Sequence, residues 1–140
     1  MKKSFKRDVS ALEEIFRFVD DFLVIQDASE KVAFATRLAV EELFTNLVRH
    51  NIMRDSGSRD ITISLERDSN QLVIRLKDFK VKPFEIPENE DIGFHQSLHE
   101  RKVGGLGVHL VRNLVDKLTY EYKDGNLCVT VIKNMENEDV

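Results

Sequence analysis

The spacing of the apolar residues changes from a helical to an alternating pattern along this chain, and no other feature constrains the fold as strongly. Apolar residues first recur at helical intervals, from Leu12 to about Gln26 and again from Ser29 to about His50. They alternate with polar residues over Ile61–Lys77 and Leu118–Ile132, and turn-forming residues interrupt each segment, as in an antiparallel hairpin. A third helical stretch, Val108–Val115, lies between the hairpins. This order predicts an α+β fold, a mostly antiparallel mixed sheet with helices packed on one face.

Two serines are predicted to cap the first two helices. Ser10 is followed by Glu13, which is the spacing of a capping box. Ser29 stands immediately before the second helical stretch and can accept a hydrogen bond from its first turn. A short strand around Ser4–Lys6 is also predicted ahead of the first helix.

Length, charge and cysteine content exclude several classes of protein. A chain of 140 residues is expected to form one domain with its own core. A net charge of −4 argues against general nucleic-acid binding, and the lone Cys128 argues against disulfides and thiolate metal clusters. No apolar run reaches membrane length and no signal-peptide core is found, so a cytoplasmic protein without membrane contacts is expected. Both charged ends are predicted to be solvated, namely Lys2, Lys3, Lys6 and Arg7 at the start and Glu136, Glu138 and Asp139 at the end.

The second helical stretch carries two polar residues beside its apolar stripe. Glu42 and Asn46 stand four residues apart, so they project from nearly the same side of the helix. A carboxylate and a carboxamide at the margin of a buried face need polar partners. A hydrogen bond between helices, a solvated edge and a functional site would each supply them, so the pair alone does not choose among these alternatives.

Four residues directly before the third helical stretch, Gly104-Gly105-Leu106-Gly107, are rich in glycine. Glycine lets the backbone approach a ligand closely, and the helix start behind it offers free N–H groups and a positive dipole end to a phosphate. A flexible hinge is the alternative interpretation. The stretch fits neither a Walker A loop, because no Gly-Lys-Ser/Thr follows, nor the Rossmann spacing.

Asp78 and Thr130 are two further candidate site residues. Asp78 stands where the first hairpin ends, and a carboxylate there can accept a hydrogen bond from a base amino group or simply form a turn. Thr130, in the last strand, either reaches the same site across the sheet or merely suits a strand. The segment Asp78–Val103 shows no period and contains both prolines, so it is either a functional lid or partly disordered.

Taken in order, these motifs resemble the Bergerat (GHKL) ATP-binding fold shared by gyrase and histidine kinases. Within that superfamily, the stretch Ala39–His50 and the second glycine box, Gly104–Asp116, look like those of the anti-sigma-factor serine/threonine kinases. The resemblance extends from about residue 5 to residue 133, so residues 1–140 are expected to be one histidine-kinase-like ATPase domain. It implies ATP and Mg²⁺ as cofactors.

The resemblance also implies a role for each matching residue. Glu42 would be the general base that deprotonates a serine hydroxyl of a protein substrate, and Asn46 would offer its amide oxygen to Mg²⁺. Asp78 would bind the adenine amino group, and Thr130 would complete the adenine pocket. His50 matches a position that the family often fills with histidine and is counted with the nucleotide-binding residues. The others in that set would be Gly104, Gly105, Leu106, Gly107 and Val108.

One residue departs from the family's pattern. The first glycine box normally reads Asp-x-Gly, whereas this chain has Asp78-Phe79-Lys80. Lys80 would crowd the nucleotide, turn away from it, or reach a phosphate and count as a nucleotide-binding residue. Two functions follow as alternatives. One is an ATP-dependent kinase that acts as an anti-sigma factor and phosphorylates a STAS-domain anti-anti-sigma protein. The other is a binding module of the same fold that sequesters a sigma factor or another partner without turnover.

A third alternative is the detached ATP-binding domain of a histidine kinase. It is less favoured because the chain shows no dimerising helix pair with a phosphoacceptor histidine and is expected to be a complete domain. The family resemblance also implies a homodimer.

Overall fold

The computed structural model describes residues 1–50, 60–79 and 106–135. The elements, in chain order, are strand β1 (Lys2–Phe5), the short 3-10 helix η1 (Val9–Ala11), helix α1 (Leu12–Ile25), helix α2 (Glu30–His50), strand β2 (Ile61–Asp68), strand β3 (Gln71–Phe79), helix α5 (Leu106–Leu114), strand β4 (Lys117–Lys123) and strand β5 (Asn126–Asn134).

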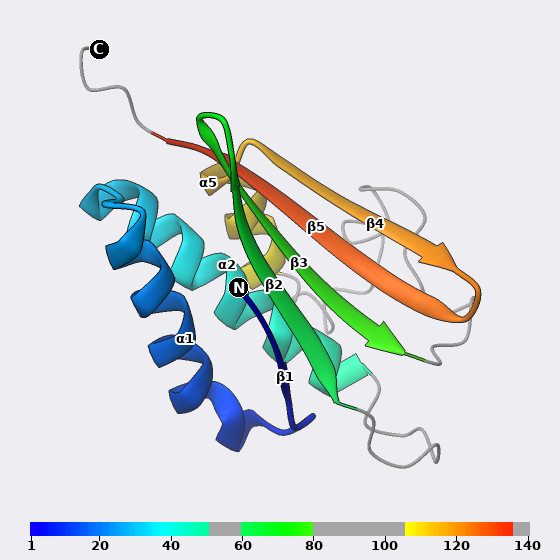
Figure 1. Ribbon diagram of the computed structural model, residues 1–140. Helices are drawn as coiled ribbons and strands as arrows, with labels where there is room; N and C mark the ends of the chain where they lie inside the picture. The colour runs from blue at the N-terminus through cyan, green and yellow to red at the C-terminus, as the bar shows by residue number, and fades with distance from the viewer. Residues whose placement is uncertain (51–59, 80–105, 136–140) are drawn as a thin grey trace.

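The described strands form one sheet in the order β1-β2-β3-β5-β4, and every pairing among them is antiparallel. Helices α1, α2 and α5 lie together on one face of this sheet (Figure 1). This two-layer arrangement confirms the α+β fold expected from the order of the periodic segments. It also means that each strand residue points either into the helical layer or away from it.

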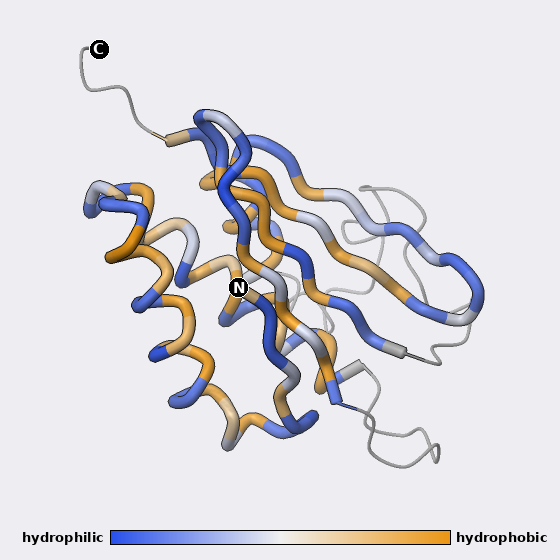
Figure 2. Tube along the Cα trace, in the orientation of Figure 1, coloured by the Kyte–Doolittle hydropathy of each residue, from blue (hydrophilic) through white to orange (hydrophobic). Residues whose placement is uncertain are grey.

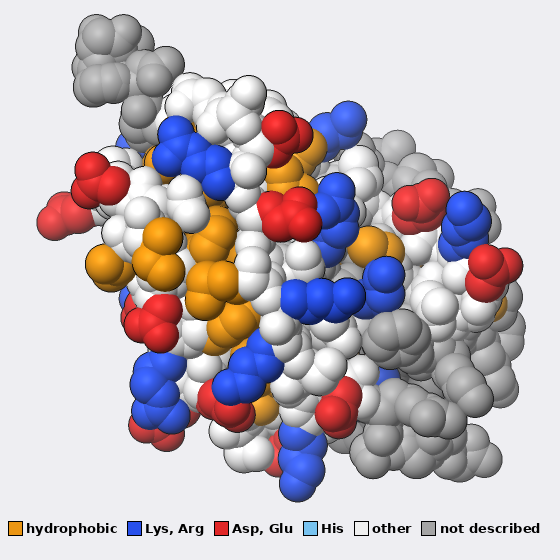
Figure 3. Space-filling view, in the orientation of Figure 1, with side chains coloured by type: hydrophobic (Ala, Val, Ile, Leu, Met, Phe, Trp, Pro, Cys, Tyr) orange, Lys and Arg blue, Asp and Glu red, His pale blue; other side chains and the backbone are white. Residues whose placement is uncertain are grey.

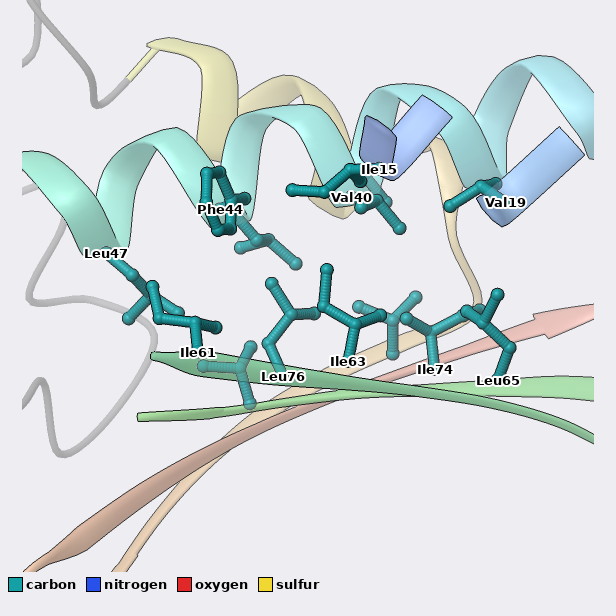
Figure 4. Close-up of a cluster of buried hydrophobic side chains, with 14 of the residues drawn as sticks. Ile15, Val19, Val40, Phe44, Leu47, Ile61, Ile63, Leu65, Ile74 and Leu76 are labelled. Carbon is teal, nitrogen blue, oxygen red and sulfur yellow. The ribbon is translucent and has the colours of Figure 1, made fainter. Parts of the chain in front are cut away.

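The core fills the space between the helices and the sheet. Ile61, Ile63 and Leu65 of β2 are fully buried. Apolar and polar residues alternate along this strand (Figure 2), so the polar residues point to the other face of the sheet. Across from these strand residues lie Ile15 of α1 and Phe44 of α2, both fully buried (Figure 4). Full burial of each such side chain contributes roughly 1.5–3 kcal/mol, so this interface fixes how α2 sits on the sheet.

The two predicted helix caps have different outcomes. Ser29 caps α2 as expected, because the Val32 N–H donates a hydrogen bond to its Oγ at 3.1 Å. The Ser10 prediction is wrong. Ser10 lies inside η1, α1 begins only at Leu12, and the Ser10 hydroxyl donates to Asp8 Oδ2 at 2.5 Å. The 3-10 turn therefore removes Ser10 from the position before α1 that a cap requires.

The turn between β4 and β5 has the geometry of a tight two-residue hairpin. Asp124 and Gly125 both have positive φ, 54° and 84°, which is the requirement of a type I′ turn. Aspartate followed by glycine is the sequence that tolerates those angles best. The turn predicted for this stretch is therefore confirmed, and it sets the register of the last two strands.

Apolar side chains gather on the surface over α1 and the start of β1 (Figure 3). Met1 and Ile25 are 47% and 69% exposed, and they line a shallow hollow together with Phe22 and Leu65. The hollow lies at the C-terminal end of α1, whereas Arg7 precedes the N-terminal end of that helix.

Among the described residues, no helix combines the length and the apolar character needed to cross a bilayer.

Candidate functional site

Glu42 of α2 lies directly against Gly107, the second residue of α5. A Cβ atom built at Gly107 would stand 2.6 Å from Glu42 Cδ and closer still to Glu42 Oε1. The Glu42 carboxylate therefore occupies the space that any other side chain at position 107 would need. The fold thus brings together two stretches that are far apart in the sequence, the glutamate-bearing helix and the glycine-led start of α5.

Burial changes the proton affinity of Glu42. Its pKa is raised above the ordinary value of 4.5, first because partial burial disfavours the charged form and then because the Glu41 carboxylate is close. Arg49 opposes both effects and lowers the pKa. A carboxylate with a raised pKa binds a proton more readily, which suits a group that removes a proton from a hydroxyl.

Asn46 follows Glu42 by four residues on α2 and is half-buried, as Glu42 is. A spacing of four residues places both side chains on one side of the helix. The predicted juxtaposition of a carboxylate and a carboxamide therefore fits the described geometry. His50 ends α2, and its side chain lies outside the described residues.

Helix α5 is held in place by apolar packing and by a hydrogen bond at its C-terminal end. Val111 is fully buried, and Val108 and Val115 pack against the core. At the C-terminal end of α5, the Lys133 ammonium donates a hydrogen bond to the Leu114 carbonyl at 2.9 Å. A cation at this end satisfies an open carbonyl and complements the helix dipole. These contacts fix the position of Gly107 relative to α2.

Of the second glycine box, Gly104–Asp116, the structure describes the part from Leu106 onward. Leu106 begins the helix, although its side chain lies outside the described residues, and Gly107 and Val108 follow. Lys80, Gly104 and Gly105 lie outside the described residues. Of the predicted lid segment Asp78–Val103, the first two residues belong to strand β3, and residues 80–103 lie outside the described residues.

Asp78 lies in an apolar row that runs across the sheet. Phe5, Ile61, Asp78 and Leu127 stand opposite one another on four neighbouring strands, and all four are buried. Asp78 is completely inaccessible and is the charged member of this row. It belongs to β3, which runs to Phe79, beyond the strand end predicted at Lys77. A carboxylate in such a row needs a buried partner.

That partner is Arg7. Arg7 Nη1 donates to Asp78 Oδ2 at 3.0 Å, and Arg7 Nη2 donates to Asp78 Oδ1. The arrangement is the fork-to-fork geometry that makes arginine–carboxylate pairs strong. The Arg7 side chain is only 11% exposed. The prediction that Arg7 belongs to a solvated terminus is therefore wrong.

The position of Arg7 relative to β1 indicates on which side of the sheet its side chain lies, although the charged composition of the N-terminal run indicates a solvated end. Arg7 stands two residues beyond Phe5, whose side chain points into the core. Continuing the two-residue period of β1 past its end places Arg7 on the same side as Phe5. Because Phe5 pairs with Ile61 and Ile61 pairs with Asp78, a long side chain at position 7 can reach the carboxylate.

Thr130 lies on the opposite face of the sheet from Asp78. The β5 residue that pairs with Asp78 is Leu127, and the buried residues of β5 are Leu127, Val129 and Val131. Thr130 alternates with these residues, and its hydroxyl lies 3.9 Å from Cys128 Sγ on the face that the helices do not cover. The predicted role of Thr130 in an adenine pocket with Asp78 is therefore wrong, because successive strand residues point to opposite faces.

Taken together, these features define a class of protein. A helix bearing a glutamate and an asparagine packs against the glycine-containing first turn of a second helix, over one face of an antiparallel sheet. This is the GHKL-type ATP-binding fold. The chain belongs to the histidine kinase-like ATPase domain family, whose model matches residues 5–133. The family implies ATP as a ligand.

Two curated proteins illustrate the similarity. The serine-protein kinase RsbW of Staphylococcus epidermidis is 28% identical over 116 residues, which cover 75% of this chain and 67% of that protein. The serine-protein kinase RsbW of Staphylococcus aureus (strain MSSA476) is 29% identical over 115 residues, which cover 74% of this chain and 67% of that protein. These relatives support the resemblance to serine kinases that the motifs indicated.

A solved structure is similar in fold. A chain in the crystal structure of the SiaB–SiaC complex from Pseudomonas aeruginosa superposes with a TM-score of 0.65 at 14% sequence identity. The match covers 94% of this chain and 88% of that chain. The similarity therefore extends over almost the whole architecture and confirms the predicted fold.

Proposed function

We propose that this protein is an ATP-dependent serine/threonine kinase that acts as an anti-sigma regulatory factor and phosphorylates a STAS-type anti-anti-sigma partner. The observation that carries the proposal is the Glu42 carboxylate seated against Gly107 at the start of α5. It joins a candidate base to a helix start whose open N–H groups suit phosphate oxygens. The family match and the RsbW relatives support the same activity.

The residues at this site fit a bound nucleotide. Because Gly107 has no Cβ, the Glu42 carboxylate can lie directly against the backbone at the start of α5. Among the described residues, no group of three or more histidine, cysteine or acidic side chains could hold a metal by itself. Mg²⁺ commonly takes only one or two protein oxygens and completes its shell with water and phosphate. Asn46 would supply such an oxygen through its side-chain amide.

ATP supplies the phosphoryl group when it is bound. The contribution of the protein is to position the acceptor hydroxyl and to take its proton. Glu42 has a pKa raised by burial and by Glu41, so its carboxylate is a better proton acceptor than an exposed glutamate. The packing of α5 on the core holds Gly107, and therefore the space beside Glu42, in a fixed place.

The partner and the assembly are also part of the proposal. A sigma factor and a STAS-domain protein are the expected partners, the protein acts as a cytoplasmic homodimer, and residues 1–140 form one domain. The basis is the resemblance of the Ala39–His50 and Gly104–Asp116 motifs to the anti-sigma-factor kinases, together with the similarity to RsbW. A net charge of −4 accords with regulation through protein partners rather than nucleic acid.

Replacing Glu42 with glutamine tests the catalytic assignment. The change keeps the size of the side chain and removes the base, so phosphoryl transfer to a STAS-domain partner should be abolished while nucleotide affinity is retained. Glu41→Gln is the control, since it alters a half-buried carboxylate on the same turn of α2; it should retain phosphoryl transfer and shift only the pH dependence of the rate, because Glu41 raises the pKa of Glu42. Asn46→Ala should instead weaken nucleotide binding in the presence of Mg²⁺. Transfer by Glu42→Gln at the wild-type rate would remove Glu42 from the mechanism.

A second candidate function is a binding module without turnover. The observation that favours it is the Arg7–Asp78 pair, because Arg7 already occupies the carboxylate expected to bind adenine. Lys80, which stands where the family has glycine, also favours a binding module without turnover. Calorimetry of the wild-type protein with ATP and Mg²⁺ separates the two functions, since a module that has lost the nucleotide shows no binding heat.

A further inference from the structure

We propose that Arg7 lowers the affinity of the nucleotide site for adenine nucleotides, because it competes with the adenine amino group for the carboxylate of Asp78. The proposal rests on the proposed function, because it takes Asp78 as the residue that binds the base. It adds a residue from outside the family's motifs, and it makes nucleotide affinity depend on the segment between β1 and η1.

The contacts of Asp78 show why the two donors compete. Arg7 engages both carboxylate oxygens, one through each terminal nitrogen. The Asp78 side chain is completely inaccessible, so its remaining lone pairs are not open to a ligand from solution. A base amino group can therefore reach this carboxylate only after the guanidinium has moved away.

Burial explains why Asp78 pairs with Arg7. Ile61 and Leu127 flank Asp78 on the two neighbouring strands, with Phe5 one strand further along the row, and none of these side chains can satisfy a charge. An uncompensated carboxylate there would be strongly unfavourable. Arg7 supplies the compensating charge, and a bound base would take over part of that role through its amino group.

The geometry allows Arg7 to leave without breaking the sheet. β1 ends at Phe5 and η1 begins at Val9, so Arg7 lies between two regular elements. Its side chain is 11% exposed and therefore reaches the surface, whereas Asp78 is fixed in a central strand paired on both sides. Displacement requires rotation of one flexible side chain towards solvent.

The expected size of the effect follows from competition between the two states. When only a fraction of the molecules has the carboxylate free, the observed dissociation constant exceeds the intrinsic one by the inverse of that fraction. If the free state is populated at about 1–10%, removal of Arg7 tightens adenine-nucleotide binding by about 10- to 100-fold.

Calorimetry with ATP and ADP in the presence of Mg²⁺ provides the first test. Arg7→Gln should bind both nucleotides at least about tenfold more tightly than the wild-type protein. The matched control is Arg37→Gln, because Arg37 pairs with Asp20 at 2.9 Å at the surface, where both side chains are about half exposed. Arg37→Gln should bind with wild-type affinity.

Arg7→Gln leaves Asp78 without its cation, so a second variant protects the test against loss of folding. Arg7→Lys keeps the positive charge and loses the planar two-pronged contact. It should bind adenine nucleotides with an affinity between those of the wild-type protein and Arg7→Gln. Thermal unfolding of each variant, measured without nucleotide, shows which of them are folded.

A direct readout in the wild-type protein does not depend on any variant. In the nucleotide-free state, the guanidinium protons of Arg7 should give slowly exchanging NMR signals, because both terminal nitrogens donate to Asp78. Saturation with ATP should return these signals to fast exchange. Signals that stay unchanged at saturation would overturn the proposal, because Arg7 would then remain on Asp78 while the nucleotide is bound.

The remaining outcomes separate this proposal from the function on which it rests. Equal affinity of the wild-type protein and Arg7→Gln for ATP would overturn the competition and leave the kinase proposal standing. Binding by Arg7→Gln alone would support the competition in its strongest form. No binding by any folded variant would overturn the proposed nucleotide site and the competition with it.

Discussion

Replacement of Gly107 by alanine tests how closely the position of Glu42 is controlled. The new Cβ would stand 2.6 Å from Glu42 Cδ, whereas non-bonded carbon atoms pack at about 3.5–4.0 Å. The carboxyl group must therefore retreat by at least about 1 Å, because the new Cβ would be closer still to Glu42 Oε1. A misplacement of about 1 Å at a reacting group can lower the rate about 100-fold. This corresponds to about 2.7 kcal/mol of transition-state stabilisation.

The same change should leave the fold intact. Gly107 lies in the first turn of α5, where alanine is favoured over glycine by up to about 1 kcal/mol. The group that must move is the end of a flexible side chain and not backbone. The free energy of unfolding should therefore stay the same or rise slightly while phosphoryl transfer falls.

Gly125→Ala is the control with the opposite pattern. Gly125 has a φ of +84°, and the nearest atom to a new Cβ is the Tyr122 hydroxyl oxygen at 4.0 Å. Alanine there has room but is strained by about 1–2 kcal/mol, so stability should fall while the transfer rate per folded molecule stays unchanged.

The assay is single-turnover phosphoryl transfer to the partner at saturating ATP, with urea unfolding of each variant. Wild-type transfer by Gly107→Ala would refute the idea that the glycine sets the position of the base. A loss of several kcal/mol in stability would show that the contact reaches the backbone and not only the Glu42 carboxylate.

The remaining predictions concern pH and a helix cap. The acidic limb of the pH–rate profile should lie above the ordinary glutamate pKa of 4.5, because burial and Glu41 raise the pKa of Glu42. Glu41→Gln should therefore move this limb to lower pH. Arg49→Gln should move it to higher pH, because Arg49 lowers the pKa of Glu42. The folded state holds the Glu42 proton more tightly than the unfolded state does. The contribution of Glu42 to stability is therefore complete below pH 4.5 and is lost as pH rises through the raised pKa. In urea unfolding at several pH values, the free energy of unfolding should decline less over this range in Glu42→Gln than in the wild-type protein. Ser29→Ala should destabilise the protein by about 1 kcal/mol in urea unfolding, because Ser29 caps α2. Ser10→Ala should change stability by less than about 0.5 kcal/mol, because Ser10 caps no helix. Equal losses in the two variants would contradict these assignments.

Local patterns in the sequence were sufficient for most of the architecture. The change from helical to alternating apolar spacing predicted α1, α2 and both hairpins, because each pattern reflects burial of one face of a regular element. Asp124-Gly125 predicted a tight turn and Ser29 predicted a cap, since both depend only on neighbouring backbone. The proximity of Glu42 and Asn46 followed from helix geometry alone.

The failures have an equally specific cause. The cap assigned to Ser10 depended on where α1 begins, and a 3-10 turn moved the cap position by one residue, to Ala11. Thr130 was assigned to the site by chain order, although the alternation of Leu127, Val129 and Val131 already placed it on the other face. The alternation of apolar residues in β5 is thus visible in the sequence, but the order of the motifs led to the opposite prediction.

Only the tertiary structure decided which distant residues share the candidate site. Spacing within α2 cannot show that Glu42 meets Gly107, because that contact depends on how α5 packs across α2. Composition assigned Arg7 to a solvated terminus, but the register of β1, β2 and β3 brings it to Asp78. Sequence patterns record which face of an element is buried, whereas the identity of the residue across that face is fixed only when the layers pack.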